Sequence, residues 1–170
     1  MVMNIKLALE VLNKDYKMCK ITHTYDLPSF KPKDNYFESL MQSIVFQQLS
    51  GKVANIIYKR ILALLPNNRI NPKKVLSLNN KDMRCAGLSL QKINYIKNLA
   101  DYFENHSFSK DKIKKMSNAE ISKELIQIKG IGQWTVDMFL MFTLNRPDVM
   151  PYSDLAIKKS IKTLFNFSLS

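Results

Sequence analysis

Apolar residues recur at helical spacing along almost the whole of this 170-residue chain, and this pattern restricts its fold more than any other feature. Only four glycines and six prolines are present, which is too few for an architecture of many strands and turns. The length suits one domain, or two small lobes that share a core. The sequence therefore predicts an all-α fold.

Capping and breaking residues predict where the first helices begin and end. One helix is expected from Ile5 to Tyr16, and Asp34 is expected to cap the next after a loop that contains Pro28 and Pro32. The inward face of that second helix is predicted to consist of five apolar residues: Phe37, Leu40, Met41, Ile44 and Val45.

The later helices follow from similar signals. A third helix is expected after Ser50-Gly51, with its apolar residues at Val53, Ile56, Ile57, Ile61 and Leu64. The remaining helices are predicted to begin at Asn71-Pro72, near Asn80, at Ser89, at the Ser117-to-Glu120 capping box, at Gln133 and at Asp154.

Charge restricts the possible partners of the chain. Lys and Arg total 26 against 14 acidic residues, which gives a formal charge of +12. Attraction to nucleic acid is one interpretation, and a lysine-rich solvated surface is the other. The two cysteines and two histidines provide no disulfide framework, zinc site or iron–sulfur cluster, and no apolar run is long enough to span a membrane.

The segment from Leu125 to Asp137 contains two glycines one residue apart, Gly130 and Gly132, between amphipathic helices. Glycine tolerates positive φ and lets another backbone come close, so a tight hairpin is predicted. Unpaired N–H groups at the start of the following helix favour an anion such as phosphate. Ile128 and Ile131 are expected to pin the hairpin to the core. An ordinary corner between helices remains the alternative.

Asp154 lies in the segment from Pro151 to Lys158, where a loop becomes a helix. The helix dipole is expected to depress the pKa of this carboxyl group and keep it ionised. An ionised carboxylate stabilises the positive charge that develops on a sugar when its glycosidic bond breaks. The pattern alone favours the simpler interpretation that Asp154 is only a helix cap.

Four segments in a fixed order resemble a known family. They are F-E-S-L-M-Q-S-I-V-F-Q-Q-L-S-G-K (37–52), G-L-S-L-Q-K (87–92), L-x-x-I-K-G-I-G-x-W-T (125–135) and P-x-x-D-L-x-I-K (151–158). Through them, residues 34–165 resemble the alkylpurine branch (DNA-3-methyladenine glycosylase II) of the helix-hairpin-helix (HhH-GPD) DNA glycosylase superfamily. The resemblance implies two small helical lobes with a DNA-binding cleft between them, and residues 1–33 would belong to the N-terminal lobe.

The resemblance also implies a reaction. An alkylated base of the 3-methyladenine or 7-methylguanine type would be flipped out of duplex DNA and released by hydrolysis of its N-glycosidic bond. Asp154 would be the catalytic carboxylate, and Trp134 and Met138 would line the base pocket. A core tryptophan is the alternative for Trp134. Asp137, beside the pocket, is a candidate second carboxylate, but a structural role is expected for it.

Further positions would contact the DNA. Gln48 would be the wedge, the side chain that fills the gap left by the flipped base, with Gln47 and Leu49 beside it; otherwise these glutamines simply end a helix. Phosphate would bind at the hairpin residues Lys129, Gly130, Ile131, Gly132, Gln133 and Thr135. A structural Na⁺ or K⁺ would be held by the main-chain carbonyls of Ile126, Ile128 and Ile131, and catalysis would need no cofactor.

Trp134 stands where bifunctional members of the superfamily carry a Schiff-base lysine. The resemblance therefore implies a monofunctional enzyme without AP lyase activity. Its partner would be damaged double-stranded DNA, and the protein is expected to be a monomer, in the bacterial cytoplasm with the nucleoid or in the eukaryotic nucleus. The family's usual C-terminal segment is not recognised after Phe165, so a non-catalytic DNA-binding protein is the alternative function.

Overall fold

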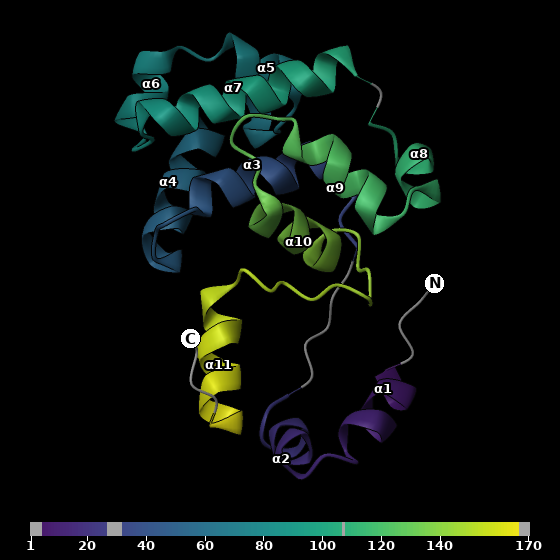
Figure 1. Ribbon diagram of the computed structural model, residues 1–170. Helices are drawn as coiled ribbons and strands as arrows, with labels where there is room; N and C mark the ends of the chain where they lie inside the picture. Colours follow the sequence, from purple (N-terminus) through teal and green to yellow (C-terminus); the bar gives the residue numbers. More distant parts are fainter. Residues whose placement is uncertain (1–4, 27–31, 107, 167–170) are drawn as a thin grey trace.

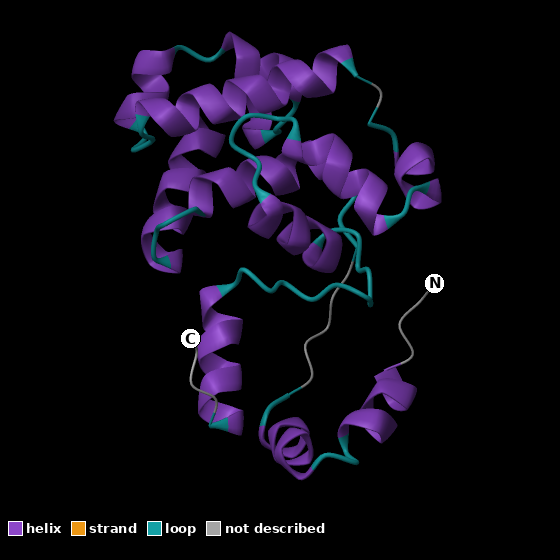
Figure 2. Cartoon of the chain, in the orientation of Figure 1, coloured by secondary structure: helices purple, strands orange, loops and turns teal. Residues whose placement is uncertain are grey.

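The computed structural model describes residues 5–26, 32–106 and 108–166. These residues form helices joined by loops and contain no strand, as Figure 2 shows, which confirms the predicted all-α class. The elements are α1 (Ile5–Leu12), α2 (Tyr16–Thr24), α3 (Tyr36–Phe46), α4 (Gly51–Ala63), the 3₁₀ turn η1 (Pro66–Asn68), α5 (Pro72–Ser77), α6 (Asn80–Cys85), α7 (Leu90–Asn105), α8 (Lys110–Lys115), α9 (Asn118–Ile126), α10 (Gln133–Phe142) and α11 (Leu155–Phe165).

The helices are arranged in a larger and a smaller group (Figure 1). α3 lies within the larger group, where it packs against α4, α7 and α10. Its five predicted inward residues, Phe37, Leu40, Met41, Ile44 and Val45, are all buried, as expected. The amphipathic pattern of α3 therefore correctly predicted which of its apolar residues belong to the core.

The smaller group consists of α1, α2 and α11 (Figure 1). The ammonium group of Lys17 on α2 donates to the carbonyl of Leu164 at 2.7 Å and lies 5.0 Å from the centroid of the Phe165 ring. These contacts join an early segment of the chain to α11. No residue described in these three helices is fully buried.

Three details of the predicted helices were wrong. The helix expected from Ile5 to Tyr16 is two helices, because the Asp15 carboxylate accepts the N–H groups of Lys17 and Met18, each at 2.9 Å, and so begins α2. Asn35, and not Asp34, caps α3, since its side-chain oxygen accepts the Glu38 N–H at 3.1 Å.

The third error concerns α4. Val53 and Ile56 are exposed, because its buried face turns through Ala54, Ile57, Tyr58 and Ile61. The short α8 and η1 were not expected. Pro28, in the expected loop, lies outside the described residues.

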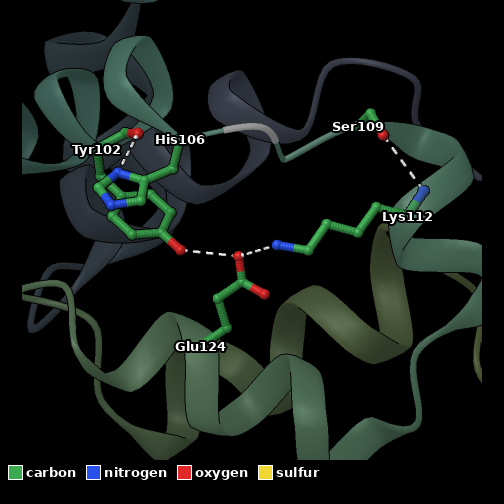
Figure 3. Close-up of polar contacts among 5 residues, drawn as sticks. All are labelled: Tyr102, His106, Ser109, Lys112 and Glu124. Atoms are coloured by element: carbon green, nitrogen blue, oxygen red, sulfur yellow. Dashed lines mark hydrogen bonds and ion pairs between the residues drawn. The ribbon is translucent and has the colours of Figure 1, made fainter.

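A polar network fixes α9, the helix that leads into the hairpin (Figure 3). The Tyr102 hydroxyl on α7 donates to Glu124 Oε1 at 2.9 Å, and the Lys112 ammonium group lies 2.7 Å from the same oxygen. Burial and the Glu124 hydrogen bond raise the pKa of Tyr102 to about 12. The His106 ring stacks on Tyr102, with 4.3 Å between centroids. Glu124 directly precedes Leu125, so the network anchors α9 beside the start of the hairpin.

Candidate active site

The predicted hairpin lies between the end of α9 at Ile126 and the start of α10 at Gln133. Ile128 and Ile131 are each 4% exposed and pin it to the core, as expected. Gly130 has φ +104°, and a Cβ atom at this position would overlap the Tyr95 ring of α7. Glycine is therefore required at Gly130 for both its backbone angle and its packing.

Gly132 differs from the expectation for the two glycines. Its φ of −103° and ψ of 174° are open to any residue, and a Cβ there would meet no atom within 4 Å. Only Gly130 needs the positive φ that was predicted for the pair. Gly132 instead opens α10, and no side chain caps that helix, so the N–H groups of its first turn remain available to an anion.

The side chains expected to bind phosphate point in different directions. Lys129 is exposed on the hairpin. Thr135 is 1% exposed and its hydroxyl accepts a hydrogen bond from Gln47, so this side chain belongs to the core and not to a phosphate site. The Gln133 side chain faces α9 and α10, where it accepts from Ser122 at 3.0 Å and donates to Asp137 at 2.7 Å. Asp137 is only 6% exposed, which fits the structural role expected for it.

Asp154 caps α11 and also contacts α10. Its Oδ1 accepts the Ile157 N–H at 2.9 Å, and its Oδ2 accepts the Trp134 indole N–H at 2.7 Å. The Trp134 hydrogen bond is the largest cause, and the Ile157 N–H the next, of a pKa for Asp154 below the ordinary value. The residue is therefore both the helix cap and an ionised carboxylate held beside the tryptophan.

An open cavity of about 390 Å³ lies next to Trp134. It is lined by Gln47, Gln48, Gly132, Trp134 and Thr135. It thus brings the α3–α4 loop, the hairpin and the tryptophan together, but Asp154 is not among the residues that line it. Met138, which was expected beside Trp134 in the pocket, is half-buried one turn further along α10 and does not line this cavity.

The α3–α4 loop, residues 47–50, presents two of its three predicted wedge residues at the surface. Gln48 is exposed and has φ +56°, and Leu49 is 38% exposed. The Gln47 amide instead donates to the Gly130 carbonyl and to the Thr135 hydroxyl, both at 3.2 Å. Gln47 therefore ties the loop to the hairpin, and its side chain is not available as a wedge.

Lys92 belongs to the site, although sequence reasoning gave it no role of its own. It lies in the first turn of α7, and its ammonium group donates to the carbonyls of Val45 and Gln47 at 2.8 and 2.7 Å. Its burial lowers the pKa of the ammonium group. The only signal was its place in the G-L-S-L-Q-K segment, which does not reveal the carbonyls that it contacts.

The described residues contain no group of three histidine, cysteine, aspartate or glutamate side chains placed to hold a metal ion. None of their helices has the length and apolar character of a membrane span.

Comparisons with known proteins place this geometry in a family. Residues 41–168 match the HhH-GPD superfamily of base excision DNA repair proteins. The chain is 33% identical over 162 residues to DNA-3-methyladenine glycosylase 1 of Schizosaccharomyces pombe, covering 94% of this chain and 71% of that protein.

Solved structures agree with the sequence comparison. The S. pombe 3-methyladenine DNA glycosylase (Mag1) in complex with abasic DNA superposes with a TM-score of 0.87 at 31% identity, over 96% of this chain and 82% of that one. A DNA-3-methyladenine glycosidase from Bacillus halodurans gives a TM-score of 0.78 at 32% identity, over 91% and 71%. The hairpin, the Trp134–Asp154 pair and these matches lead to one conclusion: the chain belongs to the HhH-GPD superfamily of base excision DNA repair proteins.

Proposed function

We propose that this protein is a monofunctional DNA glycosylase that removes alkylated bases from duplex DNA. One observation carries the proposal: Asp154 accepts a 2.7 Å hydrogen bond from Trp134, which borders the cavity at the hairpin, and this bond lowers the pKa of its carboxyl group. A helix cap alone needs only the Ile157 N–H, so the second contact supports a role in chemistry. The names of the relatives, DNA-3-methyladenine glycosylases, support the substrate class.

In the proposed reaction the damaged nucleotide leaves the helix stack and enters the cavity beside Trp134. The bond between C1′ and the base nitrogen breaks, and its electron pair neutralises the cationic alkylated ring, so no general acid is needed. The Asp154 carboxylate stabilises the positive charge that develops on the sugar. Water then adds to C1′, and its proton passes to solvent by way of Asp154.

The DNA backbone would be held at the hairpin. The N–H groups that open α10 and the exposed Lys129 provide positive charge for one phosphate. Gln48 and Leu49, exposed on the α3–α4 loop, would fill the gap left by the flipped base. Gln47 and Thr135 would not contact the DNA themselves; the hydrogen bond between them holds the loop against α10.

A Na⁺ or K⁺ ion would be held by the main-chain carbonyls of Ile126, Ile128 and Ile131. Carbonyl oxygens are suitable ligands for such ions. The Ile128 carbonyl accepts the Ile131 N–H at 2.9 Å, which leaves it one further lone pair. When bound, the ion would add positive charge next to the phosphate.

The monofunctional assignment rests on Trp134. An indole cannot form a Schiff base, and its N–H is already committed to Asp154. The protein would act as a monomer on damaged double-stranded DNA, in the compartment that holds the chromosome: the bacterial cytoplasm or the eukaryotic nucleus. A non-catalytic DNA-binding protein would have no need of the Trp134–Asp154 bond and is the less favoured function.

The proposal is tested by incubating the purified protein with duplex DNA that contains N3-methyladenine and N7-methylguanine. Free bases in solution are then separated by chromatography, with an undamaged duplex and a sample without protein as controls. Release of free base above the spontaneous rate is expected. Tight binding without any release would favour the non-catalytic function.

A further inference from the structure

The ammonium group of Lys92 connects α7 to a segment nearly fifty residues earlier, through its bonds to the carbonyls of Val45 and Gln47 at 2.8 and 2.7 Å. Val45 lies in the last turn of α3, where carbonyls lack partners within the helix. The negative end of the helix dipole also favours a cation at this place. Lys92 therefore caps α3 from another helix.

The carbonyl of Gln47 belongs to the peptide unit that joins it to Gln48. Gln48 has φ +56°, a left-handed conformation that costs a residue with a side chain free energy. Rotation of this peptide unit would relieve that strain, and it would also swing the carbonyl away from Lys92. The hydrogen bond from Lys92 therefore opposes the rotation and holds Gln48 in its left-handed conformation.

Two other contacts join the same parts of the molecule. The Gln47 side chain donates to the Gly130 carbonyl of the hairpin at 3.2 Å. Gly130 in turn lies against the ring of Tyr95, which is three residues after Lys92 and so on the same face of α7. The α3–α4 loop, the hairpin and α7 thus hold one another in a closed set of contacts.

These contacts surround an open groove of about 450 Å³, lined by residues of the loop, of the first two turns of α7 and of the hairpin. Because a hollow lies between the three parts, apolar packing there is limited. The shape of the loop consequently depends on a few polar contacts. Among them, the two hydrogen bonds from the Lys92 ammonium group are those with a charged donor.

We propose that Lys92 is a positioning residue, which fixes the α3–α4 loop in the shape that enters the DNA stack and couples this loop to the phosphate-binding hairpin. The proposal rests on the function proposed above, in which Gln48 and Leu49 are the wedge. Lys92 would touch neither the damaged base nor the sugar. Its loss should impair opening of the stack and leave the chemistry at Asp154 intact.

The chain offers a matched control on the same helix. The ammonium group of Lys97 also donates to two carbonyls, those of Leu76 and Leu78, at 2.6 and 2.7 Å. Burial lowers its pKa in the same direction as that of Lys92. Lys92→Met and Lys97→Met remove equivalent capping contacts, but only the first lies at the loop.

Wedge insertion is measured without base release. A duplex carries a tetrahydrofuran abasic analogue opposite 2-aminopurine, whose fluorescence rises when it loses its stacking. At saturating protein, wild type and Lys97→Met are expected to give the same rise, and Lys92→Met a smaller one. If Lys92→Met is not folded at the assay temperature, Lys92→Gln, whose amide still donates one bond, takes its place.

Excision is measured in parallel under single-turnover conditions on two substrates. In the paired substrate the alkylated base has its normal partner; in the unpaired substrate it lies opposite an abasic position, so less free energy is needed to flip it. Lys92→Met removes two charge-assisted hydrogen bonds, so the excision rate on the paired substrate divided by the rate on the unpaired one should fall by at least about tenfold. Lys97→Met should leave the ratio unchanged, and Lys92→Arg should restore part of it.

Equal losses on both substrates, or the same fluorescence rise in Lys92→Met as in wild type, would overturn the positioning role. Failure of the proposed function is a separate result: wild type itself would then release no base from either substrate, while the fluorescence comparison would still report on the loop.

Discussion

The indole N–H of Trp134, at the start of α10, donates to the carboxylate of Asp154, at the start of α11, over 2.7 Å. The two residues are twenty positions apart in the chain, and the bond fixes the carboxylate beside the hairpin. It is also the largest cause of the lowered pKa of Asp154. A tryptophan at this position therefore orients the carboxylate and extends its ionised form to lower pH, in addition to any contact that it makes with a base.

The first prediction follows from this bond. Trp134→Phe keeps an aromatic ring but removes the donor, so the pKa of Asp154 should rise toward its ordinary value. Activity needs the ionised form, which is lost as pH falls through this pKa. The acid limb of the excision rate should therefore move to higher pH in the variant. A single-turnover pH profile checks this. An unchanged acid limb would mean that the indole hydrogen bond does not lower the pKa of Asp154.

A linked expectation concerns stability. The folded-state pKa of Asp154 is depressed, so its contribution to stability is present above the unfolded pKa and is lost as pH falls through the folded one. Trp134→Phe should reduce that contribution, and its melting temperature should differ less between neutral and acidic pH. Thermal unfolding of wild type and Trp134→Phe at several pH values measures this difference in melting temperature.

The two hairpin glycines give a second prediction. Gly130→Ala forces a side chain into a positive φ and onto the Tyr95 ring, which should destabilise the fold by about 1–3 kcal/mol. Gly132→Ala meets open space, so its effect on stability should stay within about 1 kcal/mol. If DNA approaches the backbone at Gly132, this variant should nevertheless bind duplex DNA more weakly.

Melting curves and binding titrations of the two glycine variants distinguish these effects. Wild-type affinity in a folded Gly132→Ala protein would mean that no phosphate comes close to this residue. Wild-type stability in Gly130→Ala would contradict the packing against Tyr95.

Lys129 provides a third prediction. It is exposed on the hairpin, and Lys114 is likewise exposed, on α8. Affinity for duplex DNA should fall steeply with salt, because bound phosphates release counterions. Lys129→Ala should reduce the salt slope by about one, and Lys114→Ala should leave it unchanged. Equal slopes for Lys129→Ala and wild type would remove Lys129 from the phosphate site.

The fourth prediction is that no covalent adduct forms. With borohydride present during base release, wild type should give no trapped protein–DNA species, and strands should break only after later alkali or heat. Trp134→Lys is the companion variant, which would gain weak trapping if its amine reached C1′. Efficient trapping by wild type, lost in Lys129→Ala, would identify Lys129 as a nucleophile and contradict the monofunctional assignment.

The sequence predicted the helices well where local signals are strong. The capping box at Ser117 and the caps at Asn71 and Ser89 depend on residues within one turn, and each lies where it was expected. Two of the three errors arose where two candidate caps compete, as between Asp34 and Asn35, or where an apolar run is wider than the buried face, as in α4. Such choices depend on packing partners that are distant in the chain.

In the candidate site, too, some features could be predicted from the sequence and others depend on contacts between distant segments. The resemblance brought Trp134, Asp154 and Gln48 to one region, and the structure does place Trp134 and Gln48 at one cavity. The inward turn of Gln47 and the contact of Lys92 with two carbonyls could not be predicted, since both depend on which backbone atoms lie opposite. Helical spacing gives the face on which a side chain lies, but not its partner.

The central claim is that Asp154 acts as an ionised carboxylate, and Asp154→Asn tests it most directly. Asparagine caps a helix as well as aspartate does, so the bond to the Ile157 N–H can persist while the charge is lost. Single-turnover release of N3-methyladenine from duplex DNA is measured together with affinity for a duplex that carries an abasic analogue. The account predicts that release falls to the spontaneous rate while affinity stays near that of wild type; near-normal release by Asp154→Asn would contradict it.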